Sequence, residues 1–219
     1  MVAFFMLKWR MSKKSKKAHC SPAVLAQHIT AGLDEAGRGP LAGPVVACAV
    51  VADRRSVLPG IKDSKKLTPK KREEFYKILI RHPGIEWGIG RVSEKVIDKI
   101  NILEATKLAM KKAVINLRNR GISCRPGFLI LDGKMKLDLP IPQRSIVKAD
   151  EKIFSCTAAS IIAKVYRDNI MKKYHKKYPR YGFDRHKGYG TPFHLKMLKK
   201  YGRCDIHRKS FHYGSSKTA

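Results

Sequence analysis

The chain has 219 residues, and its 47 Lys and Arg against 17 Asp and Glu give a formal net charge of +30. Its hydrophobic content of 43% is that of a globular protein, which excludes a wholly disordered chain. No apolar run approaches the ~18 residues of a membrane-spanning helix, so we expect no membrane partner. The charge favours nucleic acid as partner, although a basic protein that is merely soluble would have the same composition.

The ends of the chain and its cysteines indicate its organisation and compartment. The five cysteines are widely spaced and form no Cys-x-x-Cys pair, which argues against a disulfide framework or a zinc ribbon and predicts reduced thiols in the cytoplasm. Residues 8–17 hold six Lys or Arg and no acid. We therefore expect residues 1–28 to be a disordered basic extension that touches phosphates, or else a dispensable one. One folded domain is expected over residues 29–213, with a flexible tail at 214–219.

From residue 30 onward, short apolar runs predict strands. A first strand over 31–35 runs into a turn rich in Gly and Pro, and the β-branched run 45–52 predicts a second. Further strands are expected at 87–92, 128–131 and 145–147. The fourth, Phe128 to Leu131, is continuously apolar, which is typical of a strand buried on both faces.

Helices are expected between these strands. Thr68 and Pro69 form an N-cap followed by proline at the first helical position, after which Phe75, Ile78 and Leu79 share a face. A second helix is expected over 102–118, and a third over 153–175, whose first half consists largely of small residues. The face of the second helix is marked by Leu103, Met110, Val114 and Leu117. Strands alternating with helices predict a layered α/β domain.

The last quarter of the chain is strongly basic. Residues 164–219 contain sixteen Lys or Arg and three Asp, with tyrosines interleaved at 174, 178, 181, 189 and 201. Stacking surfaces among cations are typical of a nucleic-acid groove, although a solvated helical face is the alternative.

The few carboxylates stand at the ends of the predicted strands. Asp34 and Glu35 end the first, Asp132 ends the fourth, and Asp150 follows the fifth. Each alone could be a turn former or a helix cap. If they converge, they repel one another unless a cation is present, and oxygen ligands select Mg²⁺ or Mn²⁺. Two such ions can hydrolyse a phosphodiester. In a basic protein this set favours a metal-dependent nuclease.

A string of motifs then resembles one family. The motifs are residues 32–46 (GLDEAGRGPLAGPVV), 63–68 (DSKKLT), 131–133 (LDG), 148–150 (KAD), 158–168 (AASIIAKVYRD), 182–183 (GF), 186–191 (HKGYGT) and 207–211 (HRKSF). In this order they resemble the signature of ribonuclease HII over about residues 29–211.

The resemblance implies a fold and an activity. The fold would be ribonuclease H-like, a mixed central sheet flanked by helices with a helical basic C-terminal region, and residues 29–213 would be its catalytic domain. The activity would be endonucleolytic cleavage of the RNA strand in RNA–DNA hybrids and cleavage 5′ to ribonucleotides embedded in duplex DNA. The products would carry 3′-hydroxyl and 5′-phosphate ends. Two Mn²⁺ or Mg²⁺ ions would be the cofactors, and we expect a monomer.

Catalytic and metal-binding roles are carried over by motif to Asp34, Glu35, Asp132 and Asp150. Asp34 and Glu35 are adjacent, so strand alternation would send their side chains to opposite faces. Both can serve only if the strand has ended or twisted at that point.

Substrate-binding roles follow in the same way. The glycines of Gly37, Arg38 and Gly39 allow the close backbone approach that would sense the ribose 2′-hydroxyl. Tyr189 matches the tyrosine that packs on the following deoxyribose, and without the resemblance it would be a surface turn residue. Phosphate contacts are expected from Lys65, Lys66 and Lys164.

One further acid and two alternative classes of protein remain. Asp168 lies far along the third helix, and we expect an ion pair or cap there rather than a ligand. The related type HIII enzymes are an alternative, but residues 1–28 are too short for their extra substrate-binding domain. A non-catalytic basic nucleic-acid-binding module is the alternative from another class, and it would require a broken acidic set.

Overall fold

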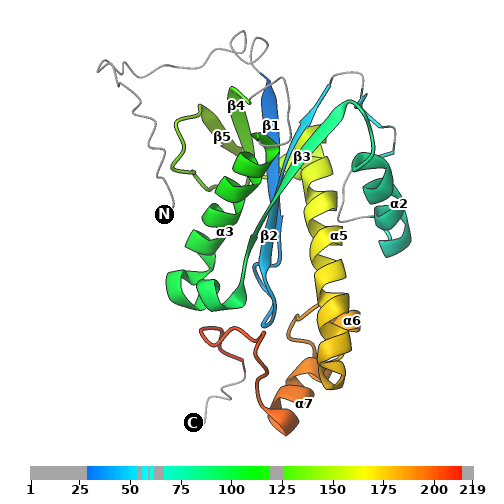
Figure 1. The fold of residues 1–219 in the computed structure, drawn as a ribbon, viewed down its shortest axis with the longest axis vertical. Helices are drawn as coiled ribbons and strands as arrows, with labels where there is room; N and C mark the ends of the chain where they lie inside the picture. The colour runs from blue at the N-terminus through cyan, green and yellow to red at the C-terminus, as the bar shows by residue number, and fades with distance from the viewer. Residues whose placement is uncertain (1–28, 54–55, 59, 62–66, 119–125, 214–219) are drawn as a thin grey trace, which may run out of the picture.

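The computed structural model describes residues 29–53, 56–58, 60–61, 67–118 and 126–213. The expected N-terminal extension and C-terminal tail therefore lie outside the described residues, as do Lys65 and Lys66. In the described part, helices cover both faces of one mixed sheet (Figure 1).

The sheet has five strands in the order β3-β2-β1-β4-β5. Their bounds are β1 Thr30–Ala36, β2 Val45–Ala52, β3 Ile85–Val92, β4 Phe128–Asp132 and β5 Gln143–Ile146. β1, β2 and β3 pair antiparallel, whereas β4 runs parallel to both β1 and β5. The expected mixed sheet is confirmed. The last strand lies two residues earlier than expected at its start, and Val147 is left 52% exposed beyond its end.

Helix α3, Glu94–Arg118, packs on one face of the sheet and α5, Phe154–Lys177, on the other (Figure 1). The backbones approach closely where the strands carry glycine. A Cβ atom at Gly90 would lie 1.8 Å from the Ala109 carbonyl oxygen, and one at Gly32 would lie 2.5 Å from the backbone nitrogen of Cys156. Because these strands have no side chain there, the two helices can seat directly on the sheet.

Small residues on α5 also allow this helix to lie close to the sheet. Ala158, Ala159 and Ala163 are all fully buried in a core cluster with Val46 and Val50 of β2. The expected small-residue helix is therefore confirmed, and it runs from Phe154 to Lys177.

Helix α2, Pro69–Leu79, begins as expected. The side chain of Thr68 accepts a hydrogen bond from the Lys71 backbone N–H, and Pro69 occupies the first turn. The expected shared face is only partly correct, because Leu79 is buried whereas Ile78 is 47% exposed.

Helix α3 is longer than expected and kinked. Its expected part starts after Asn101, whose φ of 63° interrupts the helix and whose side chain accepts from the backbone N–H groups of Leu103 and Glu104. The turns from Glu94 to Ile100 have no counterpart in the expectation. Met110, Val114 and Leu117 are buried as the spacing predicts, but Leu103 is 41% exposed.

The C-terminal region consists of short elements packed on the end of α5, and it forms its own small core. These elements are η2 Pro179–Tyr181, α6 Phe183–His186 and α7 Pro192–Tyr201, whereas another short helix, α4 Ala149–Lys152, directly precedes α5. Tyr181 and Phe183 stack at 5.5 Å between ring centroids inside this core. The expectation that Tyr181 offers a stacking surface to nucleic acid is therefore wrong, because the apolar core already buries its ring.

Candidate active site

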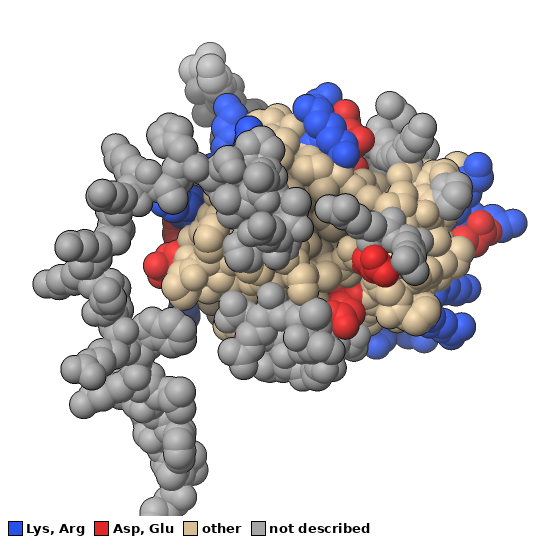
Figure 2. Space-filling model, turned by 90° about the horizontal axis from the view of Figure 1, so that it is seen from above, with Lys and Arg blue, Asp and Glu red and all other residues tan. Residues whose placement is uncertain are grey.

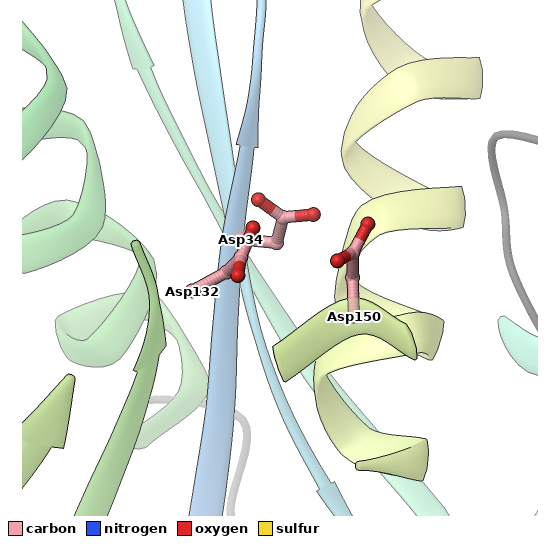
Figure 3. Close-up of side chains that lie close together, drawn as sticks. All are labelled: Asp34, Asp132 and Asp150. Atoms are coloured by element: carbon pink, nitrogen blue, oxygen red, sulfur yellow. The ribbon is translucent and has the colours of Figure 1, made fainter. Parts of the chain in front are cut away.

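Three carboxylates converge where the parallel pairing of β1 and β4 ends (Figure 3). Asp34 from β1, Asp132 from the end of β4 and Asp150 from α4 each offer an oxygen atom, and these atoms lie within 4.8 Å of one another. Asp34 and Asp150 are buried, and Asp132 is partly exposed. In Figure 3 the side chains of the three residues point toward a common space.

The topology explains this convergence. β1 and β4 are parallel and in register at Leu33 and Leu131, so that the next residues, Asp34 and Asp132, lie side by side. Asp150 comes from a separate element. The backbone N–H of Ala149 donates a 2.8 Å hydrogen bond to Oδ1 of Asp132, which fixes the first turn of α4 against the end of β4.

The electrostatics of the cluster favour a bound cation. Burial, followed by the charges of Glu35 and Asp132, raises the pKa of the Asp34 carboxyl well above its ordinary value. Burial likewise raises the pKa of Cys156 to about 12, so that the neighbouring sulfur stays a thiol. Carboxylates that repel one another and have only oxygen atoms to offer fit a hard divalent cation.

Glu35 stands beside the cluster rather than within the group of three. β1 continues through it to Ala36, so the strand has not ended at Asp34. Oε1 of Glu35 accepts a 3.3 Å bond from Arg38, whereas its Oε2 is buried with no hydrogen-bond donor among the described residues. Burial raises the pKa of the Glu35 carboxyl, and the Arg38 charge partly opposes this. A buried carboxylate oxygen that lacks a donor fits a nearby cation.

The carboxylates line an open pocket of about 350 Å³. Asp34, Glu35 and Asp132 share this pocket with the Gly37–Gly39 turn and with Lys164 and Tyr189. All the expected site residues that the structure describes, apart from Asp150, therefore line this one pocket. Asp150 lies next to the pocket, because its carboxylate is close to those of Asp34 and Asp132.

The Gly37–Gly39 turn and Tyr189 lie close together in the lining of this pocket. Tyr189 is 45% exposed, and a Cβ atom at Gly39 would lie 3.8 Å from Cε1 of the Tyr189 ring. At Gly37 the φ is 98°, and a Cβ atom there would lie 2.1 Å from Nε of Arg167. Glycine is therefore required at position 37 both by its backbone conformation and by the lack of space.

A chain of hydrogen bonds holds the backbone of Tyr189. Nδ1 of His194 lies 2.9 Å from the Tyr189 carbonyl oxygen, so that this nitrogen must carry the proton. In the neutral ring Nε2 of His194 is then an acceptor, and the 3.0 Å contact assigns the donor to Nε2 of His207. Nδ1 of His207 accepts in turn from the Cys204 backbone N–H at 2.8 Å.

The ionisation of the two histidines agrees with this chain. Burial lowers the pKa of both His194 and His207 to about 4, so each ring is neutral at pH 7. The buried pair therefore fixes the loop from which the Tyr189 ring projects into the pocket.

Only some of the basic side chains that line the pocket were expected from the sequence. Lys164 lies 5.8 Å from the centroid of the Tyr189 ring and pairs with Asp168 at 3.0 Å. The expectation of an ion pair at Asp168 is therefore confirmed. Arg72 of α2 and Ser160 of α5 also line the pocket, and neither was expected from the sequence as a binding residue. Arg72 carries no sequence signal that separates it from its many basic neighbours, whereas Ser160 lies within the 158–168 motif.

The surface beyond the pocket is also basic. Lys and Arg side chains project around the edge of the face seen from above (Figure 2). Among the described helices, none is long and apolar enough to cross a membrane.

Comparison with known proteins decides the family. The model of the ribonuclease HII family matches residues 31–213. The chain belongs to the ribonuclease HII family. The ribonuclease HII of Chlamydia caviae is 55% identical over 183 residues, which are 84% of this chain and 84% of the relative. That of Bacillus cereus is 55% identical over 181 residues, 83% of this chain and 68% of the relative.

Solved structures of ribonucleases HII agree with this assignment. The ribonuclease H2 of Pyrococcus horikoshii is 30% identical, with a TM-score of 0.66 over 83% of this chain and 93% of its own. A PCNA:RNase HII complex from Archaeoglobus fulgidus contains a chain that is 25% identical, with a TM-score of 0.69 over 87% of this chain and 98% of that one. The expected ribonuclease H-like fold is confirmed.

Family membership also establishes the general activity. The chain is a ribonuclease H, an endonuclease that acts on RNA–DNA hybrids and depends on a divalent metal. The alternative of a non-catalytic basic module is excluded, and the cluster of Asp34, Asp132 and Asp150 is consistent with the metal dependence.

Proposed function

We propose that this ribonuclease H cleaves 5′ to ribonucleotides embedded in duplex DNA, as well as within RNA–DNA hybrids, and leaves 3′-hydroxyl and 5′-phosphate ends. One observation carries the proposal: the carboxylates, the Gly37–Gly39 backbone and the Tyr189 ring line the same pocket. A single nucleotide step can therefore meet the three groups together.

In this proposal Asp34, Glu35, Asp132 and Asp150 hold two Mn²⁺ or Mg²⁺ ions. The convergence of Asp34, Asp132 and Asp150 and the buried Oε2 of Glu35 support the assignment. Such ions, when bound, activate the attacking water and stabilise the leaving oxygen. The protein supplies the alignment, because Asp132 is fixed through its bond to Ala149.

Two consecutive sugars, the ribose and the sugar that follows it, are recognised by different groups. Backbone amides at Gly37–Gly39 would bind the ribose 2′-hydroxyl, which distinguishes RNA from DNA. The Tyr189 ring would pack on the next sugar, where a missing 2′-hydroxyl allows close approach. The 3.8 Å spacing between a Cβ position at Gly39 and the Tyr189 ring is consistent with the two groups contacting adjacent nucleotides.

Phosphate contacts are assigned to Lys164, which lines the pocket, and to Lys65 and Lys66, which lie outside the described residues. The high positive charge would draw the nucleic acid to the pocket. The proposal also takes residues 29–213 as the catalytic domain of a monomeric, cytoplasmic enzyme that needs no membrane.

A cleavage assay tests the proposal. The substrate is duplex DNA with one ribonucleotide, labelled at either end and incubated with no divalent ion, with Mg²⁺ or with Mn²⁺. We expect metal-dependent cleavage on the 5′ side of the ribonucleotide, and ligation or polymerase extension should show 3′-hydroxyl and 5′-phosphate ends. An all-DNA duplex is the control. Cleavage of continuous hybrids alone would contradict the proposed recognition of a single ribonucleotide.

A further inference from the structure

Arg208 is a buried guanidinium whose hydrogen bonds within the described structure all go to backbone carbonyls, and it lies 4.9 Å from the centroid of the Phe211 ring. It is 1% exposed, and it donates hydrogen bonds to the carbonyl oxygens of Gly37 at 2.5 Å, Arg38 at 2.8 Å and Gly43 at 2.9 and 3.0 Å. No carboxylate of the described residues forms an ion pair with it. Burial, followed by the Arg167 charge, lowers its pKa to about 9, so that it remains charged at neutral pH.

Such a group is costly to keep. A buried charge without an opposite charge is stabilised only if its donor groups form hydrogen bonds. Here the acceptors are backbone carbonyls between Gly37 and Gly43. Two of its partner carbonyls belong to the turn that carries the proposed 2′-hydroxyl sensor.

Because the peptide group is planar, this contact also sets the direction of the neighbouring N–H groups. In a planar trans peptide the C=O and N–H bonds point to opposite sides, and the described chain has no cis peptide. Arg208 draws the carbonyls of Gly37 and Arg38 toward the interior, so that the N–H groups of Arg38 and Gly39 point away from it. The turn lines the pocket, and neither N–H donates to another described residue.

We infer that Arg208 is a positioning residue for ribose recognition, which holds the amides of Arg38 and Gly39 toward the 2′-hydroxyl of the substrate. The inference rests on the proposed function of the Gly37–Gly39 backbone. Arg208 does not touch the substrate. It acts from the interior side of the turn by fixing two peptide planes, because its rigid, planar guanidinium can bind both carbonyl oxygens at once.

Arg167 offers a matched control. It is also fully buried, and its guanidinium also donates to three backbone carbonyls, those of Ala42, Pro44 and Lys187. The Arg167 side chain packs against Gly37, but it binds no carbonyl of the Gly37–Gly39 turn. Replacing Arg167 by lysine should therefore cost stability of the same kind without releasing the two peptide planes.

The test compares Arg208→Lys, Arg208→Met and Arg167→Lys with the wild-type protein. The dissociation constant is measured, in buffer without divalent ions so that no cleavage occurs, for a duplex with one ribonucleotide and for the same duplex made only of DNA. The ratio of the two constants gives the preference for the ribonucleotide. We expect both Arg208 variants to lose roughly tenfold in this ratio, as the loss of one or two hydrogen bonds implies, with little change in affinity for the all-DNA duplex. Arg167→Lys should keep the ratio.

A spectroscopic readout separates positioning from general stability. The backbone ¹⁵N–¹H signals of Arg38 and Gly39 should shift in both Arg208 variants, at a temperature where melting curves show them folded. They should shift less in Arg167→Lys, because Arg167 packs against Gly37 without binding its carbonyl. An unchanged preference or unchanged signals in folded Arg208 variants would overturn the inference. Loss of cooperative melting in both would also overturn it, because Arg208 would then serve the fold. A wild-type protein with no preference would contradict the proposed function itself, and the inference with it.

Discussion

The backbone N–H of Ala149 donates a 2.8 Å hydrogen bond to Oδ1 of Asp132. This bond joins two elements that each carry a carboxylate of the site, because Ala149 begins the short helix that carries Asp150. Asp132 therefore has two roles in the structure. Its own carboxylate faces the site, and its bond to Ala149 holds the helix that carries Asp150 in place.

Replacing Asp132 by asparagine should abolish cleavage and leave the fold intact. The amide oxygen of the new side chain can still accept from Ala149, whereas the negative charge that a cation needs is lost. We expect activity on an RNA–DNA hybrid to fall at least about a hundredfold, since even changes to groups that only orient the metal ligands cost about 10–100-fold. Hybrid binding should be nearly unchanged, because it depends on the cationic surface.

The matched control is Asp138→Asn, at a fully exposed side chain paired with Lys111. It should keep full activity. A loss of cooperative unfolding in Asp132→Asn, together with weak hybrid binding, would instead make Asp132 a structural residue.

Asp34 should make the metal-free protein less stable as the pH rises. Its pKa is raised in the folded state, chiefly by burial. The folded protein thus binds the proton more tightly than the unfolded chain, and stability falls as the pH rises from the ordinary value of 3.8 through the raised pKa. Asp34→Asn removes this loss, so at pH 7 without metal we expect the variant to melt at a higher temperature than the wild type.

Divalent ions should stabilise the wild-type protein but not the Asp34→Asn variant. Mn²⁺ or Mg²⁺ binds the folded cluster and should raise the Tm of the wild-type protein but not that of Asp34→Asn. Thermal melting at pH 5 and pH 7, with and without metal, measures both effects. Glu104→Gln, at a half-exposed surface ion pair, is the control and should respond like the wild type. Equal metal shifts in Asp34→Asn and wild type would remove Asp34 from the metal site.

Lys164 should contribute one phosphate contact. Binding of a positively charged surface to a duplex releases counterions, so that affinity falls steeply between about 50 and 200 mM salt. Lys164→Gln should weaken binding about equally for all sequences and reduce the slope of log affinity against log salt by about one. Lys107→Gln, on α3 and paired with Glu104, should leave the slope unchanged. A wild-type affinity that barely responds to salt would refute the electrostatic interpretation.

Tyr189 should determine the preference for the RNA-to-DNA step. Tyr189→Ala removes the ring that would pack on the deoxyribose, and a stacking contact is worth about 1–3 kcal/mol. Activity on a single embedded ribonucleotide should therefore fall roughly ten- to hundredfold more than activity on a continuous hybrid. Tyr201→Ala, at an exposed ring on α7, is the control and should affect neither. Equal losses on both substrates would mean that Tyr189 supports only the fold or general binding.

Local patterns were enough to predict most elements. Strand β2 has the bounds that its β-branched run predicts, and Thr68 caps α2 as its sequence indicates. These features depend on neighbours within a few residues. The first turns of α3 were missed because Asn101 takes a positive φ that divides the helix, so that the apolar spacing does not run through it.

The candidate carboxylates were also found from the sequence, because acids at strand ends are rare in so basic a chain and because the motifs resemble a known family. The different contacts that these carboxylates make were not predicted from the sequence. Asp34 joins Asp132 and Asp150, whereas the carboxylate of Glu35, on the next residue of the same strand, binds Arg38. Both side chains line the pocket although β1 continues through Glu35, so backbone alternation alone does not predict where their oxygens lie.

The sequence by itself determined the alternation of strands and helices, the family, and the residues that could carry the chemistry. Only the tertiary structure decided how they are held. Arg208 lies 171 residues from Gly37 along the chain, and the buried His194–His207 pair is separated by 13. Neither contact has a local signature, because whether a guanidinium or an imidazole is buried, and which carbonyl it meets, depends on the packing of distant segments that exclude water together.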